Sequence, residues 1–152
     1  MTFVEQLLTR STIAAKVHAA DWKEAVKVGT DLLVAAGTIE ERYYDEILKC
    51  HEELGPYYLL APGLAMPHAR PESGVIETSF ALVTLEKPVE FGDEYNDPID
   101  ILITMAAKDA KTQNEEAIVQ VVTLLDDEER VAALRGAVDD AALRAVLTNI
   151  KE

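Results

Sequence analysis

Thr78-Ser-Phe-Ala-Leu-Val-Thr-Leu85 is apolar at alternating positions on both of its faces. A strand that faces water on one side alternates apolar and polar residues, whereas a strand covered on both sides is apolar throughout. Ile99 to Ala107 is a second apolar run of this kind. The two runs predict central strands of a sheet that has helices on each face.

Upstream of these strands, the sequence predicts helices around a further strand. Residues 3–9 can form a short amphipathic helix, and the β-branched residues of 11–17 favour a first strand. Asp21 and Glu24 then have the spacing of a capping box. An amphipathic helix is therefore expected from Asp21 up to Gly37, a residue suited to ending it.

A second capping-box pair, Thr38 and Glu41, predicts another helix from Ile39 to about Leu54. Its apolar stripe contains His51, which we interpret as a packed structural residue. Gly55-Pro56 ends this helix, and Tyr57 to Leu60 is a short apolar run of strand type.

Downstream of the second central strand, Thr112 and Glu115 form a third capping-box pair, with Gln113 in the first turn of the helix that follows. Short helices are expected over 127–135 and 140–150. The apolar residues of the helix after Thr112 predict a buried face made of Ala117, Ile118, Val121, Val122 and Leu125.

Helices that interleave with apolar strands are typical of the α/β class. We predict a three-layer α/β/α sandwich, with a mixed sheet of about five strands and helices on both faces. At 152 residues the chain can bury one substantial core, so residues 1–152 are expected to form a single domain.

The charge of the chain narrows the classes of partner. It has 28 acidic residues against 14 Lys and Arg, a net charge of -14, which disfavours nucleic acid and anionic membrane surfaces. Neither a signal-peptide pattern nor an apolar run long enough to insert into a membrane is present. A cytoplasmic location is therefore expected.

Cofactor and metal signatures are also missing from the sequence. Cys50 is the one cysteine, and the three histidines are too far apart for a zinc pattern. There is no Gly-rich phosphate loop and no nucleophile elbow. We therefore predict neither a metal nor a cofactor.

The stretch Ala61-Pro-Gly-Leu-Ala-Met-Pro-His-Ala-Arg-Pro-Glu-Ser-Gly74 places His68 among prolines and glycines. Leu64 and Met66 can anchor a short buried strand, and the prolines beside His68 cannot donate to a sheet ladder. His68 thus lies at the end of an element, where functional side chains are commonly found. The local pattern by itself also fits a hydrogen-bonded structural histidine.

The run Gly63-Leu-Ala-Met-Pro-His-Ala-Arg-Pro-Glu-Ser-Gly-Val75 resembles the phosphorylation site of enzyme IIA domains of the sugar phosphotransferase system (PTS), fructose/mannitol superfamily. The likeness is greatest to the ascorbate-specific branch and covers nearly the whole chain. The other stretches that carry it are Asp21-Trp22, Ala25-Val-Lys-Val-Gly29, Asp31-Leu-Leu-Val-Ala-Ala36, Arg42-Tyr-Tyr44, Gly55-Pro-Tyr57, Phe80-Ala-Leu-Val-Thr-Leu85 and Asn96-Asp-Pro-Ile-Asp-Ile-Leu-Ile-Thr-Met-Ala-Ala107.

This resemblance implies a phosphoryl carrier with the same α/β architecture. His68 would take the group on Nε2 from phospho-HPr and pass it to a cysteine of an enzyme IIB, which serves a membrane enzyme IIC. Phosphoryl transfer requires hydrogen-bond donors around the phosphoryl oxygens. Arg70 can supply a guanidinium fork, although it also fits a solvated loop charge. The free N–H groups of the helix after Thr112 are expected to face His68.

The sequence departs from the family at Gln113, where relatives usually place a second histidine in a Thr-His-Gln-Glu type of run. Gln113 can donate a hydrogen bond but cannot become a cation. This favours an alternative function, a regulatory binding module switched by phosphorylation, like nitrogen-type enzymes IIA. A third interpretation, a degenerate domain, is disfavoured by His68 and Arg70.

Overall fold

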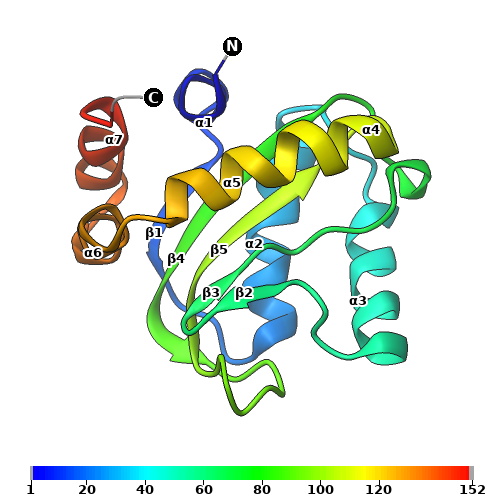
Figure 1. Ribbon diagram of the computed structural model, residues 1–152, viewed down its shortest axis with the longest axis horizontal. Coiled ribbons are helices and arrows are strands. Elements are labelled where there is room, and N and C mark those ends of the chain that lie inside the picture. The colour runs from blue at the N-terminus through cyan, green and yellow to red at the C-terminus, as the bar shows by residue number, and fades with distance from the viewer. Residues whose placement is uncertain (1, 151–152) are drawn as a thin grey trace.

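The computed structural model describes residues 2–150, which build a five-stranded sheet in the order β1-β4-β5-β3-β2 (Figure 1). The sheet is mixed: β4 and β5 are antiparallel to each other. β1 runs parallel to β4, and β3 runs parallel to β5. The prediction of a mixed sheet is confirmed. The strands are β1 (Ile13–Val17), β2 (Leu59–Ala61), β3 (Leu64–Ala65), β4 (Ser79–Val89) and β5 (Ile99–Ala106).

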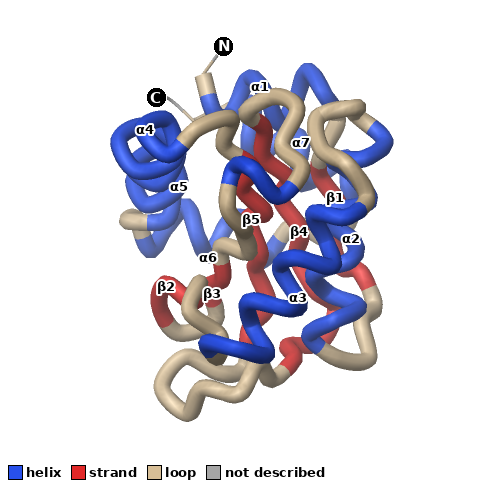
Figure 2. The backbone as a smooth tube through the Cα atoms, turned by 90° about the vertical axis from the view of Figure 1, so that its right-hand side faces the viewer, coloured by secondary structure: helices blue, strands red, loops and turns tan. Residues whose placement is uncertain are grey.

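Helices cover both faces of this sheet (Figures 1 and 2). One face carries α2 and α3, and the other carries α1, α5, α6 and α7. The three-layer sandwich is therefore confirmed. The helices are α1 (Phe3–Arg10), α2 (Trp22–Ala35), α3 (Arg42–Leu54), α4 (Ala110–Thr112), α5 (Ile118–Leu125), α6 (Glu128–Gly136) and α7 (Asp140–Thr148). None of these helices is long and apolar enough to cross a membrane.

Strand β4 separates two hydrophobic cores, as its apolar sequence predicts. Phe80 and Leu82 enter the core beneath α1, α5, α6 and α7, whereas Ala81 and Val83 enter the core beneath α2 and α3. The strand extends beyond the predicted run, through Lys87-Pro88 to Val89. The pairing of β4 with β5 becomes irregular after Thr84, and residues 86–88 are exposed. Regular pairing returns at Val89, which is opposite Ile99.

The helix predicted at Asp21 forms as expected, because the Asp21 side chain accepts a hydrogen bond from the Glu24 N–H at 2.9 Å. The capping box predicted at Thr38 is wrong. Thr38 is buried, and its hydroxyl donates to the Leu33 carbonyl and accepts from the Ser79 hydroxyl. Since Thr38 belongs to the core, α3 begins only at Arg42.

The helix after β5 also begins elsewhere than predicted. Asp109 is its N-cap and accepts from the Thr112 N–H at 2.7 Å, so the capping box at Thr112 is wrong. A π-helical turn, Gln113–Ala117, then joins α4 to α5. This wider turn rotates the apolar face, and Val122, predicted to be buried, is 44% exposed.

Candidate functional site

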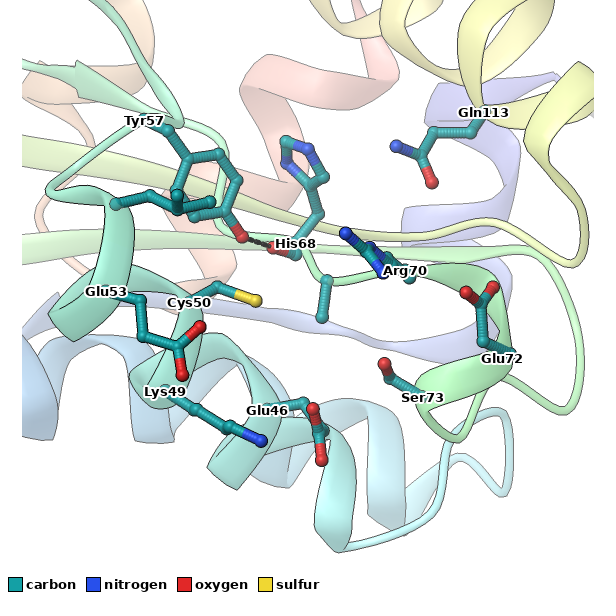
Figure 3. Close-up of a pocket in the computed structure, with 12 residues that line it drawn as sticks. Glu46, Lys49, Cys50, Glu53, Tyr57, His68, Arg70, Glu72, Ser73 and Gln113 are labelled. Atoms are coloured by element: carbon teal, nitrogen blue, oxygen red, sulfur yellow. Dashed lines mark hydrogen bonds between the residues drawn. The ribbon is translucent and has the colours of Figure 1, made fainter.

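A cleft of about 480 Å³ opens beside His68 (Figure 3). Four segments form its walls: α3, the turn between α3 and β2, the loop that follows β3, and the start of the π-helical turn. The loop supplies His68 and Arg70, while Gln113 comes from the π-helical turn and Cys50 from α3. The structure therefore gathers His68, Arg70 and Gln113, the three predicted site residues, around one cleft.

The loop that carries His68 is tied to the sheet on both sides. The Met66 N–H donates to the Tyr58 carbonyl at 2.9 Å, and the Met105 N–H, at the end of β5, donates to the Pro67 carbonyl at 3.0 Å. Pro67 itself has no N–H to satisfy. Backbone bonds from two directions thus fix the residues just before His68.

Tyr43 of α3 holds the loop on the other side of His68. Its hydroxyl lies 2.8 Å from the Met105 carbonyl oxygen and accepts from the Ala69 N–H at 2.9 Å. The ring is fully buried, and burial raises the pKa of the Tyr43 hydroxyl. Tyr43 was not identified as a site residue from the sequence, because its partners lie far along the chain.

The imidazole of His68 is half-buried and oriented by one hydrogen bond, between Nδ1 and the Met66 carbonyl oxygen at 2.8 Å. A carbonyl can only accept, so Nδ1 carries the proton in the neutral ring. Burial lowers the pKa of His68, and the bond to Met66 partly opposes this shift. His68 is therefore mainly neutral at pH 7, with Nε2 unprotonated.

Tyr57 lies directly against His68 and was also missed from the sequence. Its hydroxyl donates to the His68 carbonyl (Figure 3), and its ring meets the imidazole edge to face at a centroid distance of 5.4 Å. The signal that could have found it is an aromatic residue directly after the Gly55-Pro56 break. That signal does not reveal which group the hydroxyl contacts.

Arg70 is exposed at the cleft, two residues after His68. Within the described chain, its guanidinium makes neither a hydrogen bond nor an ion pair. Other cations have partners: Arg10 pairs with Glu77, and Arg135 pairs with Asp100. The Arg70 donors are thus available to an anion bound near His68.

Gln113 is half-buried, and its side-chain amide points into the cleft (Figure 3). The helix start near Thr112 does reach the cleft, but the N–H groups of Thr112 and Gln113, which were expected to be free, are occupied. The Thr112 N–H donates to the Asp109 side chain, and the Gln113 N–H donates to the Asp109 carbonyl at 3.0 Å. The group that this segment offers to the cleft is therefore the Gln113 side chain.

His51 is a packed residue, as predicted. It is 8% exposed, its Nδ1 lies 2.7 Å from the Tyr58 hydroxyl, and its ring stacks on Trp22. Burial lowers the pKa of His51.

Over residues 2–150, no three His, Cys, Asp or Glu side chains are grouped so that they could hold a metal ion.

Comparisons with known proteins agree with the fold. Residues 6–150 match the family described as phosphoenolpyruvate-dependent sugar phosphotransferase system, EIIA 2. The chain is 56% identical over 135 residues to the ascorbate-specific PTS system EIIA component of Shigella flexneri, covering 89% of this chain and 88% of that protein.

Two solved structures are also similar. The mannitol-specific cryptic phosphotransferase enzyme IIA CmtB of Escherichia coli has a TM-score of 0.85 and 34% identity, covering 99% of this chain and all of CmtB. The mannitol enzyme IIA of Escherichia coli, solved in complex with phosphorylated mannitol enzyme IIB, has a TM-score of 0.76 and 26% identity. That match covers 91% of this chain and 95% of the other.

Proposed function

From the fact that this chain belongs to the EIIA 2 family of the phosphoenolpyruvate-dependent sugar phosphotransferase system, we propose that His68 is its phosphoryl acceptor. In this proposal phospho-HPr is the donor, and a cysteine of an enzyme IIB is the recipient. The observation that carries it is the Nδ1 bond of His68 to the Met66 carbonyl, which leaves a neutral Nε2 at the cleft.

The chemistry needs little beyond alignment. The bond between Nε2 and phosphorus forms as the bond between phosphorus and the donor breaks, and the proton stays on Nδ1, hydrogen-bonded to the Met66 carbonyl oxygen. Charge develops on the phosphoryl oxygens during this step. Arg70 supplies the cationic donors for these oxygens, and the Gln113 amide supplies a neutral one.

Relatives guide the choice of sugar and partners. The high identity to an ascorbate-specific EIIA component supports ascorbate or a similar sugar acid as the transported compound. A mannitol enzyme IIA has been solved in complex with its enzyme IIB, which supports an enzyme IIB as partner here. The chain then acts in the cytoplasm as one EIIA domain and reaches a membrane enzyme IIC only through enzyme IIB.

One observation favours a second function, a regulatory module switched by phosphorylation. Gln113 cannot supply the positive charge that a histidine would supply at the same position of the cleft. A regulatory switch tolerates slower turnover than a transport relay does. The two functions differ in the fate of the phosphoryl group on His68, since only the relay requires its transfer to an enzyme IIB.

Intact-mass measurement tests the proposal directly. Purified protein is incubated with phosphoenolpyruvate, enzyme I and HPr, and its mass is compared with that of His68→Ala and His18→Ala. His18 is exposed and outside the cleft, so its variant is the matched control. We expect one added phosphoryl group in wild type and His18→Ala, and none in His68→Ala.

Adding enzyme IIB then separates the two functions. Loss of the added mass on addition of an ascorbate-type enzyme IIB supports the relay, whereas retention of the phosphoryl group supports the regulatory module. A wild-type protein that gains no phosphoryl group, beside an active control enzyme IIA, contradicts both.

A further inference from the structure

We propose that Tyr57 is a positioning residue for His68, holding both its main chain and its ring so that Nε2 stays directed at the incoming phosphoryl group. This inference rests on the proposed function of His68. The Tyr57 hydroxyl donates to the His68 carbonyl, and the two rings pack edge to face, with an interplanar angle of 79° (Figure 3). One side chain thus contacts His68 at two separate points.

The Tyr57 bond completes a closed series of contacts around the histidine. The Met66 N–H donates to the Tyr58 carbonyl, and the Met66 carbonyl accepts from His68 Nδ1. The His68 carbonyl in turn accepts from Tyr57, the neighbour of Tyr58. Without the Tyr57 hydroxyl, the His68 carbonyl loses its side-chain donor, while the Ala69 N–H of the same peptide group keeps its bond to Tyr43.

Tyr57 is 40% exposed, and both its backbone and its ring are held by neighbouring residues. The turn after α3 is closed by the Gly55 N–H, which donates to the His51 carbonyl, and by the Tyr57 N–H, which donates to the Gly55 carbonyl, each at 2.8 Å. The Tyr57 ring also packs edge to face on Tyr58, which is 2% exposed and bonded to His51. The contacts on His68 are therefore anchored in α3 and its core.

The Tyr57 hydroxyl remains a hydrogen-bond donor at neutral pH. Burial raises the pKa of Tyr57, and the neighbouring Cys50 adds to this shift, so the tyrosine stays protonated. Its O–H is donated to the His68 carbonyl. Tyr57 therefore acts through His68, and its effect is geometric, where displacements near 1 Å can cost about 100-fold in rate.

The variants Tyr57→Phe and Tyr57→Leu separate the two contacts. Tyr57→Phe keeps the ring and removes the hydroxyl, whereas Tyr57→Leu removes both the hydroxyl and the ring. Tyr95→Phe is the matched control, because Tyr95 is 90% exposed in the loop before β5 and lies outside the cleft. Thermal unfolding of all three shows whether each variant is folded.

Two readouts distinguish positioning from mere stability. The first is the kcat and KM for phosphorylation by phospho-HPr. We expect kcat to fall roughly 3- to 10-fold in Tyr57→Phe, with KM nearly unchanged, since one hydrogen bond is lost. The fall should be larger in Tyr57→Leu, and Tyr95→Phe should match wild type.

The second readout is ¹⁵N NMR of the His68 ring in the unphosphorylated protein, which reports the ratio of its tautomers. Wild type should show the Nδ1–H form, and both Tyr57 variants should show an increased share of the Nε2–H form. Wild-type kcat together with a wild-type tautomer ratio in folded Tyr57→Leu would overturn the proposal. Because the NMR readout needs no phosphoryl donor, it tests Tyr57 even if the proposed function fails.

Discussion

The Nδ1 atom of His68 lies 2.8 Å from the carbonyl oxygen of Met66, two residues earlier in the chain. This contact makes the two ring nitrogens different, because Nδ1 carries the proton and Nε2 keeps its lone pair. Pro67, between the two residues, is held through its own carbonyl by Met105 of β5. The orientation of the imidazole is therefore set by the end of a central strand.

The rate of phosphorylation should depend on pH through His68. Burial lowers the pKa of His68 from its ordinary value of 6.5, so the neutral nucleophile persists below pH 6.5. We expect a rate that is flat near pH 7 and falls in acid, with a midpoint below 6.5. Quenched-flow phosphorylation from pH 5 to 8 measures this, and a midpoint above 6.5 would contradict the environment described for the ring.

Replacing Arg70 by alanine should slow phosphorylation by roughly 10- to 100-fold, because a charged donor to the phosphoryl oxygens is lost. The guanidinium is exposed and makes neither a hydrogen bond nor an ion pair in the described structure. The free energy of unfolding should therefore change by less than about 0.5 kcal/mol.

Lys49→Ala is the control for the Arg70 variant, because Lys49 also lines the cleft and carries the same charge. It should keep nearly the wild-type rate. Equal losses in the two variants would mean that the cleft requires only a general positive potential.

Gln113→His should raise the rate of phosphorylation, by roughly 3- to 10-fold at pH 6.5, where part of the added imidazole is cationic. The position faces the cleft from the π-helical turn, opposite α3. Gln120→His, on the exposed side of α5, is the matched control. An unchanged rate and an unchanged lifetime of the phosphorylated form would argue against any role for position 113.

Gly29→Ala should destabilise the protein by about 1–3 kcal/mol through overpacking. A Cβ at Gly29 would lie 2.2 Å from Oγ1 and 3.1 Å from Cβ of Thr104, where α2 crosses β5. Chemical denaturation measures the change. Gly136→Ala is the control, because nothing lies within 4 Å of a Cβ there and alanine favours a helix.

The double variant Gly29→Ala, Thr104→Ala tests the cause of this loss. It removes the clashing hydroxyl, which has no hydrogen-bond partner in the described structure. Stability should therefore be largely recovered. If the two single effects simply add, the contact between Gly29 and Thr104 is not the reason.

The sequence predicted best those features that depend on local periodicity. The run that forms β4 is apolar on both faces, which indicates a strand buried on both sides. Asp21 lies at the start of a clear amphipathic pattern, which predicts α2. Capping was harder to predict near Thr112. Asp109 and Thr112 have the same spacing as Thr112 and Glu115, and only the structure shows that the first pair begins the helix. The π-helical turn that follows has no local signal.

Contacts between distant residues were beyond local patterns. The Thr38 hydroxyl accepts a hydrogen bond from Ser79, 41 residues away in the chain. Thr38 therefore lies in the core, although its spacing to Glu41 fits a capping box. Tyr43 reaches Met105 across 62 positions. The cleft residues His68, Arg70 and Gln113 were identified through family resemblance, whereas the tyrosines that support His68 emerged only from the fold.

The layered arrangement also separates the cleft from the helices nearest the chain ends. α1 and α7 pack together on the face of the sheet opposite α3, and no cleft residue comes from α1, α6 or α7 (Figure 1). A fluorescent protein or a sensor-chip tether attached to the outer surface of α1 or α7 would therefore leave the His68 cleft open. Immobilised carrier could then be charged and discharged repeatedly while the binding of its partners is followed in real time.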